Sequence, residues 1–373
     1  MRASDQLVIG GGVIGLACAW RLAREGVDVR LLEAGRVGGG STAAALGALM
    51  PASPLREGAI QRLQWPSLWS FGSFCEELEK ASGSRVLYEQ RGRIELIGSE
   101  KRHRRAREEV EAARVRWPMK DGLPALELLD RDKGKRREPR VSFGEWGALL
   151  CRLTAQVETG SLVSALREAC VAAGVRIEEG RRVDSLIIVC GRVRGARCGA
   201  EEIPSGGVLV TAGTGVAGLG APLDTLTPVV PVKGQALLLR VEDPMISFLV
   251  KGGGTYLMRR GDHHLLVGAT TEPEAKFDDT ATEEAREKLI SGASEILPDL
   301  AMVEVEEHLV GLRPAAPDRR PWLGAVPGID GLHVAAGHYK IGLALAPVTA
   351  EILADLIVRG RTKHDIARFA IPR

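Results

Sequence analysis

The sequence has no paired cysteines, little net charge and no long apolar run. Its six cysteines are scattered without a CxxC pair, which argues against a disulfide scaffold or zinc site and favours buried thiols in a reducing cytosol. A net charge of +2 requires no anionic partner such as nucleic acid. No apolar run reaches the ~18 residues of a spanning helix, and the first strand begins too early for a preceding signal peptide. We therefore expect a cytoplasmic protein without metal.

The length and composition favour a globular chain of two domains. The chain has 373 residues, of which 45% are hydrophobic and 26% charged. It shows no internal repeat and no low-complexity segment. These observations leave the function open, so the individual motifs must supply it.

A glycine fingerprint opens the chain. The stretch "LVIGGGVIG", from Leu7 to Gly15, joins an apolar run to a GxGxxG turn, and apolar residues then recur at helical spacing up to Gly26. A second apolar run, Val27–Leu32, ends in Glu33. This order of strand, glycine turn, helix, strand and acid predicts a dinucleotide site, whereas the glycine motif alone would also fit an ordinary loop.

Each part of this unit has a physical reason. Gly10 permits the tight turn, Gly12 lets a pyrophosphate approach the backbone, and Gly15 lets the helix pack closely on the strand. The helix N-terminus offers free N–H groups and a partial positive charge to phosphates. Glu33 can accept hydrogen bonds from a ribose hydroxyl and would repel the 2′-phosphate of NADP, but it leaves FAD and NAD both open.

Small residues recur at two further places that could face a nucleotide. The stretch "GGGSTAAALGALMPASP" follows Glu33 directly, and Ser41 and Thr42 within it can donate hydroxyl hydrogen bonds and cap a helix. The alternative is an ordinary flexible loop. A later strand, "VLVTAG", ends in Gly213, a position that typically lies beside a bound dinucleotide.

The patterns along the chain predict an α/β fold with two interleaved domains. A Rossmann-like domain is expected over residues 1–84, 155–228 and 312–373, and an antiparallel-sheet substrate domain, or cap, over 85–154 and 229–311. Residues 65–82 predict one amphipathic helix and 85–99 a β-hairpin. Residues 101–117 predict a charged helix with a solvated face, and 132–140 an exposed loop.

Six blocks of sequence, in this order, resemble the D-amino-acid oxidase family of FAD-dependent oxidoreductases, and most closely the glycine oxidases of thiamine biosynthesis. They are "VIGGGVIGLACAWRLAREG", "GGGSTAAALGAL", "PVKGQALLL", "TYLMRRGDHHLLVGATTE", "VGLRPAAPDRRPWLGAVP" and "HVAAGHYKIGLALAPVTAEILADLI", and they span essentially the whole chain. Their order and spacing are more specific than the glycine fingerprint. The resemblance implies FAD rather than NAD, bound by the Rossmann-like domain.

The resemblance also implies which residues bind FAD. Glu33 and Ala34 would contact the adenosine ribose, Val183 would bind the adenine through its backbone, and the segment from His338 to Ala344 would lie along the flavin. Some relatives carry a covalent flavin on a histidine where this chain has Ala44, so the FAD should be non-covalent. The implied FAD-binding residues are Gly10, Gly12, Val13, Ile14, Gly15, Glu33, Ala34, Ser41, Thr42, Leu46, Gly47, Ala48, Val183, Gly213, His338, Tyr339, Lys340, Ile341, Gly342, Leu343 and Ala344.

Three residues match positions that hold the substrate in the family. Arg313, in "GLRP", matches an arginine that grips a carboxylate through two hydrogen bonds. Tyr256, in "TYLMRR", matches a tyrosine that hydrogen-bonds to the same carboxylate. Lys340 stands where glycine oxidases usually have arginine, and it keeps the charge but loses the planar fork. Ile341 replaces a usual asparagine, which leaves the preference for glycine open. A surface arginine, a half-buried strand tyrosine and a solvent-facing lysine are the alternatives.

The implied activity is the oxidative deamination of glycine or another small amino acid or amine. Hydride would pass to the flavin, and an imine and hydrogen peroxide would form. A neutral amine needs no general base, so His338 is expected to be structural, while the helix from Gly342 would direct its positive end to the flavin. A dehydrogenase that passes electrons to a quinone or other carrier is the alternative. A tRNA-modifying oxidase and a non-catalytic flavoprotein fit less well, and a homo-oligomer remains open.

Overall fold

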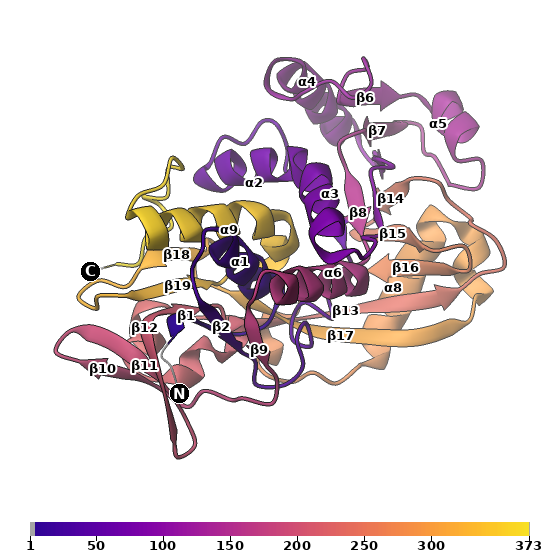
Figure 1. Ribbon diagram of the computed structural model, residues 1–373. Coiled ribbons are helices and arrows are strands. Elements are labelled where there is room, and N and C mark those ends of the chain that lie inside the picture. The colour runs from indigo at the N-terminus through magenta and orange to yellow at the C-terminus, as the bar shows by residue number, and fades with distance from the viewer. Residues whose placement is uncertain (1–3, 373) are drawn as a thin grey trace.

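The computed structural model describes residues 4–372 and contains two eight-stranded sheets and one small sheet (Figure 1). The first large sheet has a parallel centre in the order β9-β2-β1-β12-β19, which confirms the Rossmann-like prediction. Strands β10, β11 and β18 join it in antiparallel pairings. Its strands are β1 (Ser4–Ile9), β2 (Val29–Leu32), β9 (Arg176–Glu178), β10 (Ser185–Val189), β11 (Arg192–Cys198), β12 (Glu201–Val210), β18 (Trp322–Ala325) and β19 (Leu332–Ala336).

Helices from distant parts of the chain cover one face of this sheet. Figure 1 shows α1 (Val13–Arg24) near the N-terminus beside α9 (Gly342–Arg359) near the C-terminus, and α6 (Thr159–Ala172) packs on α1 as well. Their apolar sides share one buried core with α2 (Ala59–Trp69) and α3 (Phe71–Ser82). The opposite face is covered partly by η1 (Gly213–Leu219) and α7 (Leu223–Leu226).

Helix α9 is apolar enough and long enough to meet the length and composition criteria for a membrane span. Half of its span-like window is buried inside the protein. Leu345, Ile352 and Leu353 are fully buried in the core that α9 shares with α1. Core packing therefore accounts for the apolar character of this helix.

The second large sheet has the order β17-β13-β16-β15-β14-β5-β7-β6 and is antiparallel except between β14 and β5. Helix α8 (Glu283–Ile296) packs on one face, and α4 (Glu100–Arg116) packs on the other face at the β6 end. The strands are β5 (Arg93–Leu96), β6 (Leu126–Leu129), β7 (Ala148–Cys151), β13 (Val230–Arg240), β14 (Leu249–Gly252), β15 (Thr255–Arg260), β16 (His264–Gly268) and β17 (Val305–Ala315). The third sheet joins β3 (Ala48–Leu49), β8 (Ala155–Val157) and β4 (Tyr88–Glu89).

Three predictions of secondary structure were wrong. Residues 85–99 form no hairpin, because β4 pairs with β8 in the small sheet while β5 pairs with β14 and β7. Residues 132–140 are not a simple loop, because the Asp130 side chain caps α5 (Arg131–Arg137) by accepting from the Lys133 N–H. The helix expected over 65–82 is two helices that meet at Ser70. The division into two domains stays a prediction, and β17 runs across its boundary at residue 312.

Candidate active site

The glycine fingerprint forms the tight connection between β1 and α1. A Cβ on Gly10, whose φ is +107°, would lie 2.7 Å from the Thr211 carbonyl oxygen, and one on Gly15 would lie 1.9 Å from the Gly10 oxygen. Glycine is therefore required at both positions. The Val13 N–H at the start of α1 donates to the Thr42 hydroxyl at 3.1 Å, so the small-residue segment is attached to the helix start.

Glu33 closes the other end of this connection. Its carboxylate accepts from the backbone N–H groups of Gly11 at 2.7 Å and Gly35 at 2.8 Å. The carboxylate thus lies beside the glycine turn and lines the cavity there, where a ribose hydroxyl could reach it.

A cavity of about 220 Å³ runs along this face and brings together most of the predicted FAD-binding residues. Ala34, Val183, Ile341 and Ala344 do not line it, and Gly15 serves packing instead. Leu46, Gly47 and Ala48 line the neighbouring pocket. Thr211, Ala212 and Thr214 also line the cavity and were not predicted, although the quoted strand "VLVTAG" contains the first two of them. The predicted residues that line the cavity are Gly10, Gly12, Val13, Ile14, Glu33, Ser41, Thr42, Gly213, His338, Tyr339, Lys340, Gly342 and Leu343.

The lining of this cavity suits the charged groups of a dinucleotide. The start of α1 borders it at Gly12 and Val13, and the start of α9 borders it at Gly342 and Leu343. Each helix start presents backbone N–H groups and a partial positive charge, and neither first turn contains an acidic residue. The cavity therefore offers two favourable places for negative charge, in addition to the ribose acceptor Glu33.

A second pocket of about 310 Å³ adjoins the first, and the two share Ser41, Ala45, Tyr339, Lys340 and Leu343 in their linings. This second pocket is called the substrate pocket below. It brings together the three predicted substrate residues, which lie on β15, on β17 and just before α9. Among residues 4–372, no aspartate or glutamate lines it.

Arg313 supplies the deep positive charge of the substrate pocket. Its guanidinium donates to the carbonyl oxygens of Thr270 at 3.0 Å and Lys233 at 3.3 Å. Among residues 4–372, no carboxylate lies within 4.0 Å of it. A Cβ on Gly234 would lie 2.0–2.1 Å from three guanidinium atoms, so only glycine there leaves space for this placement. Burial lowers the pKa of Arg313, and an anionic ligand would relieve that cost.

Tyr256 lies over Gly268 of the next strand. A Cβ on Gly268 would lie 2.6 Å from the tyrosine ring and 2.6 Å from Leu46. Burial raises the pKa of Tyr256 to about 12, although the nearby positive charge of Arg313 acts to lower it. The phenol therefore stays protonated and can donate a hydrogen bond into the pocket.

Lys340 is exposed at the edge of the substrate pocket. Its ammonium donates to the Thr271 hydroxyl at 2.8 Å and lies 5.3 Å from the centre of the Tyr339 ring. The Arg319 guanidinium lies 4.6 Å from the same ring. Burial, Arg313 and Arg319 all lower the pKa of Lys340. The ring of Tyr339, whose φ is +52°, thus stands among cations at the turn into α9.

His338 is buried, and its Nε2 lies 3.2 Å from the Thr349 hydroxyl on α9. Burial lowers the pKa of His338 to about 4, so the imidazole is neutral at ordinary pH. It lines the FAD cavity but not the substrate pocket. These contacts favour a role in holding the turn before α9 rather than in removing a substrate proton.

The described part of the chain contains no group of three or more histidine, cysteine, aspartate or glutamate side chains arranged to hold a metal ion. All six cysteines are free thiols, and four of them are buried. Burial raises the pKa of Cys75 and Cys170 to about 12. These buried thiols are accordingly unreactive packing groups.

The geometry defines an FAD-binding oxidoreductase, and comparison with known proteins bears this out. The chain matches the family of FAD dependent oxidoreductases over residues 5–356 and belongs to that family. It is 33% identical to a glycine oxidase of Pseudomonas aeruginosa, over 98% of this chain and 97% of that protein. The structure of glycine oxidase from Geobacillus kaustophilus matches with a TM-score of 0.91 at 28% identity, over 100% and 99% of the two chains.

An iminodiacetate oxidase from Chelativorans sp. BNC1 is also similar, with a TM-score of 0.87 at 25% identity over 98% of both chains. The family resemblance and the dependence on FAD are thus confirmed. The protein is an FAD-dependent enzyme of the amino-acid oxidase type. The individual roles of its site residues stay predictions.

Proposed function

We propose that the protein oxidises glycine or another small amino acid to the imine and passes the electrons to oxygen, which yields hydrogen peroxide. The observation that carries the proposal is the unpaired positive charge of Arg313. Its guanidinium is partly buried, without a carboxylate partner in the described chain, in a pocket that adjoins the FAD cavity. An unpaired buried cation is costly unless a ligand brings the opposite charge.

The residues of the substrate pocket would bind and orient the substrate. FAD, when bound, supplies the acceptor for one hydride, which carries both electrons of the oxidation. Arg313 would hold the substrate carboxylate through its fork, and the neutral Tyr256 phenol would donate a further hydrogen bond. No side chain in the substrate pocket is placed as an obvious proton acceptor, which agrees with a reaction that begins from a neutral amine.

A substrate with a second carboxylate is the other candidate. Lys340 places a second cation at the edge of the pocket, without a carboxylate within 4.0 Å in residues 4–372. The similarity to an iminodiacetate oxidase supports this candidate. We also retain electron transfer to a quinone as the alternative to oxygen, and we expect the enzyme to act in the cytoplasm.

A panel of amines tests the proposal on purified holoenzyme. Glycine, D-alanine, D-aspartate, sarcosine and iminodiacetate would be mixed with it without oxygen, and bleaching of the flavin absorbance would be followed. The same substrates with oxygen would be assayed for peroxide. Bleaching by at least one amino acid, followed by peroxide, supports the proposed function. Bleaching without peroxide assigns the dehydrogenase alternative, and no bleaching by any of the amines contradicts the proposal.

A further inference from the structure

A second, more strongly charged cavity lies on the same face of the second sheet as the substrate pocket. Paired residues cross that sheet in the row Gly268, Tyr256, Lys251, Glu95 and Leu149, each opposite the next on neighbouring strands. Paired residues point to one side, so this row lies on one face. Tyr256 lines the substrate pocket, and the last three residues line a cavity of about 400 Å³, which is called the basic cavity below.

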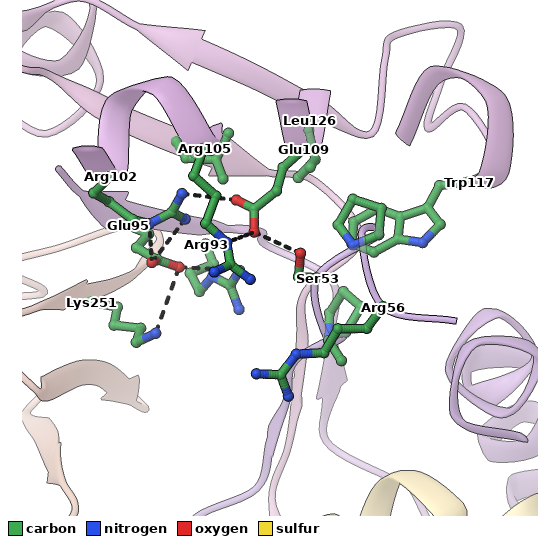
Figure 2. Close-up of a pocket in the computed structure, with 14 residues that line it drawn as sticks. Ser53, Arg56, Arg93, Glu95, Arg102, Arg105, Glu109, Trp117, Leu126 and Lys251 are labelled. Carbon is green, nitrogen blue, oxygen red and sulfur yellow. Dashed lines mark hydrogen bonds and ion pairs between the residues drawn. The ribbon is translucent and has the colours of Figure 1, made fainter. Parts of the chain in front are cut away.

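Helix α4 and residues 51–56 complete the basic cavity (Figure 2). The Ser53 hydroxyl donates to Glu109 of α4 at 2.6 Å, and Arg116 donates to the Pro54 carbonyl oxygen at 2.6 Å. The same stretch of chain begins at the wall of the substrate pocket, which Met50 lines. The two cavities are therefore neighbours that share one segment of chain.

The lining of the basic cavity has an excess of positive charge. Five of its side chains are cations and two are carboxylates, which leaves three positive charges in excess. Figure 2 shows four of the cations around the two carboxylates and Arg56 farther away. Glu95 lies 3.0 Å from Arg102, 3.5 Å from Arg93 and 3.6 Å from Lys251. Arg102 also contacts Glu109 at 2.9 Å.

The remaining positive charge is not balanced within the protein. The contact between Arg105 and Glu109 is long, at 3.8 Å, and Arg102 contacts the same carboxylate more closely. Arg56 is exposed and has no carboxylate within 4.0 Å among residues 4–372. The carboxylates organise the cations but are too few to neutralise them.

Two residues that line the basic cavity each have a buried donor without a hydrogen-bond or ion-pair partner among residues 4–372. The donors are the Nε of Arg93, whose side chain is 11% exposed, and the indole Nε1 of Trp117, a residue that is 7% exposed. Buried donors of this kind are rare without an unobserved water or ligand. Arginine donors in a fixed array match the oxygens of phosphate particularly well.

We propose that the basic cavity binds a small molecule through a phosphate group. This site is separate from the FAD cavity and from the Arg313 carboxylate site. The phosphate is either free in solution or carried on the distal end of an amino-acid substrate, since residues 50–56 connect the two cavities. Arg93, Arg105, Lys251 and Arg56 supply its positive contacts.

Titration calorimetry of the holoenzyme with inorganic phosphate tests the site, in a phosphate-free buffer of low ionic strength and with saturating acetate to occupy Arg313. Arg93→Gln should weaken phosphate binding by roughly 10- to 100-fold, because charge-assisted hydrogen bonds are among the strongest polar contacts. Arg56→Gln and Lys251→Gln, at more exposed positions, test the site should Arg93→Gln fold poorly. Arg104→Gln is the matched control, because Arg104 is exposed on α4 and does not line the cavity.

Weaker phosphate binding in the cavity variants, with wild-type binding in Arg104→Gln, supports the proposal. No phosphate binding, equal losses in all variants, or loss of binding with acetate overturns it. Steady-state kinetics with O-phosphoserine and serine distinguish the two sources. If Arg56→Gln or Lys251→Gln lowers kcat/KM for O-phosphoserine but not for serine, the phosphate is carried on the substrate. If kcat/KM is unchanged for both substrates while calorimetric binding is weaker, the phosphate is free. Calorimetry does not depend on turnover, so failure of this site is distinguishable from failure of the proposed oxidase activity.

Discussion

The placement of Arg313 depends on a glycine that lies beneath it. Gly234 faces Arg313 on the neighbouring strand β13, and a Cβ there would come within 2.0–2.1 Å of the guanidinium. The atoms that clash are at the end of a flexible side chain, so the backbone need not move. Gly234→Ala should therefore displace the guanidinium and leave the fold and the FAD cavity intact.

The size of the effect follows from what the displaced guanidinium loses. Complete removal in Arg313→Ala should cost about 2–5 kcal/mol of binding to the carboxylate, which is a loss of roughly 30-fold to several thousand-fold in kcat/KM. Gly234→Ala keeps the charge nearby but loses the position of the fork. We expect a loss of about 1.5–3 kcal/mol, or roughly 10- to 150-fold, as for one charge-assisted hydrogen bond.

Steady-state kinetics on the best amine would measure this loss, together with the affinity for acetate and the FAD content. Gly98→Ala is the control, because a Cβ there meets nothing within 4 Å. Wild-type kcat/KM and acetate affinity in Gly234→Ala would refute the reasoning. An equal loss in Gly98→Ala, or loss of FAD in Gly234→Ala, would refute it as well.

Other predictions follow from the neighbouring contacts. Lys340→Met should lower kcat/KM for glycine less than Arg313→Ala does, because an exposed ammonium makes one point contact; the reverse order in steady-state kinetics would assign the anchoring role to Lys340. Because the pKa of His338 is lowered from 6.5 to about 4, the free energy of unfolding should decrease as pH falls from ~6.5 toward 4, by about 2 kcal/mol at about pH 5. Urea unfolding at ~pH 6.5 and at about pH 5 should show a smaller decrease in His338→Gln than in the wild type. Lys233→Met removes a buried ammonium that contacts Asp278 at 2.9 Å; because Asp278 is exposed, stability should fall by only about 1 kcal/mol or less, while limited proteolysis near residues 273–280 should become faster. Acid precipitation should release the FAD into the supernatant, and colour in the pellet would contradict non-covalent binding.

The part of the FAD cavity around the glycine turn could be predicted from the sequence because its residues are local. The strand, glycine turn, helix and Glu33 lie within one continuous stretch. The contact of Gly10 with Thr211 is not local, and the sequence did not indicate it. The substrate pocket could be found only through the family resemblance. Arg313 meets Gly234 because β17 pairs with β13, and that register sets Arg313 opposite Val232 and diagonally across from Gly234. A glycine inside the apolar strand "VKGQALLL" was the available signal, since it often marks a close approach.

The charged helix at residues 101–117 shows where composition alone is misleading. Its charges were predicted to form a solvated face, and this prediction was wrong for part of the helix. Glu109 is buried, and Arg102 is half-buried between Glu95 and Glu109. Positions 102, 105 or 106, and 109 recur at helical spacing and so share one side. The sequence of the helix itself does not indicate that this side packs against the sheet, because the charged residues of β5 that it contacts come earlier in the chain.

Both the substrate pocket and the basic cavity depend on the alternation of one sheet. Residues of one parity on β13, β15 and β17 place Gly234, Tyr256 and Arg313 on the same face, and the pairing continues that face through Lys251 to β5. Under α8 the opposite parity is apolar, and Leu237, Leu257 and Val267 belong to the core there. A shift of one residue in any of these pairings would turn charged side chains into that apolar core, at a cost of several kcal/mol for each unpaired charge. The buried packing under α8 therefore fixes the register that holds the substrate residues in place.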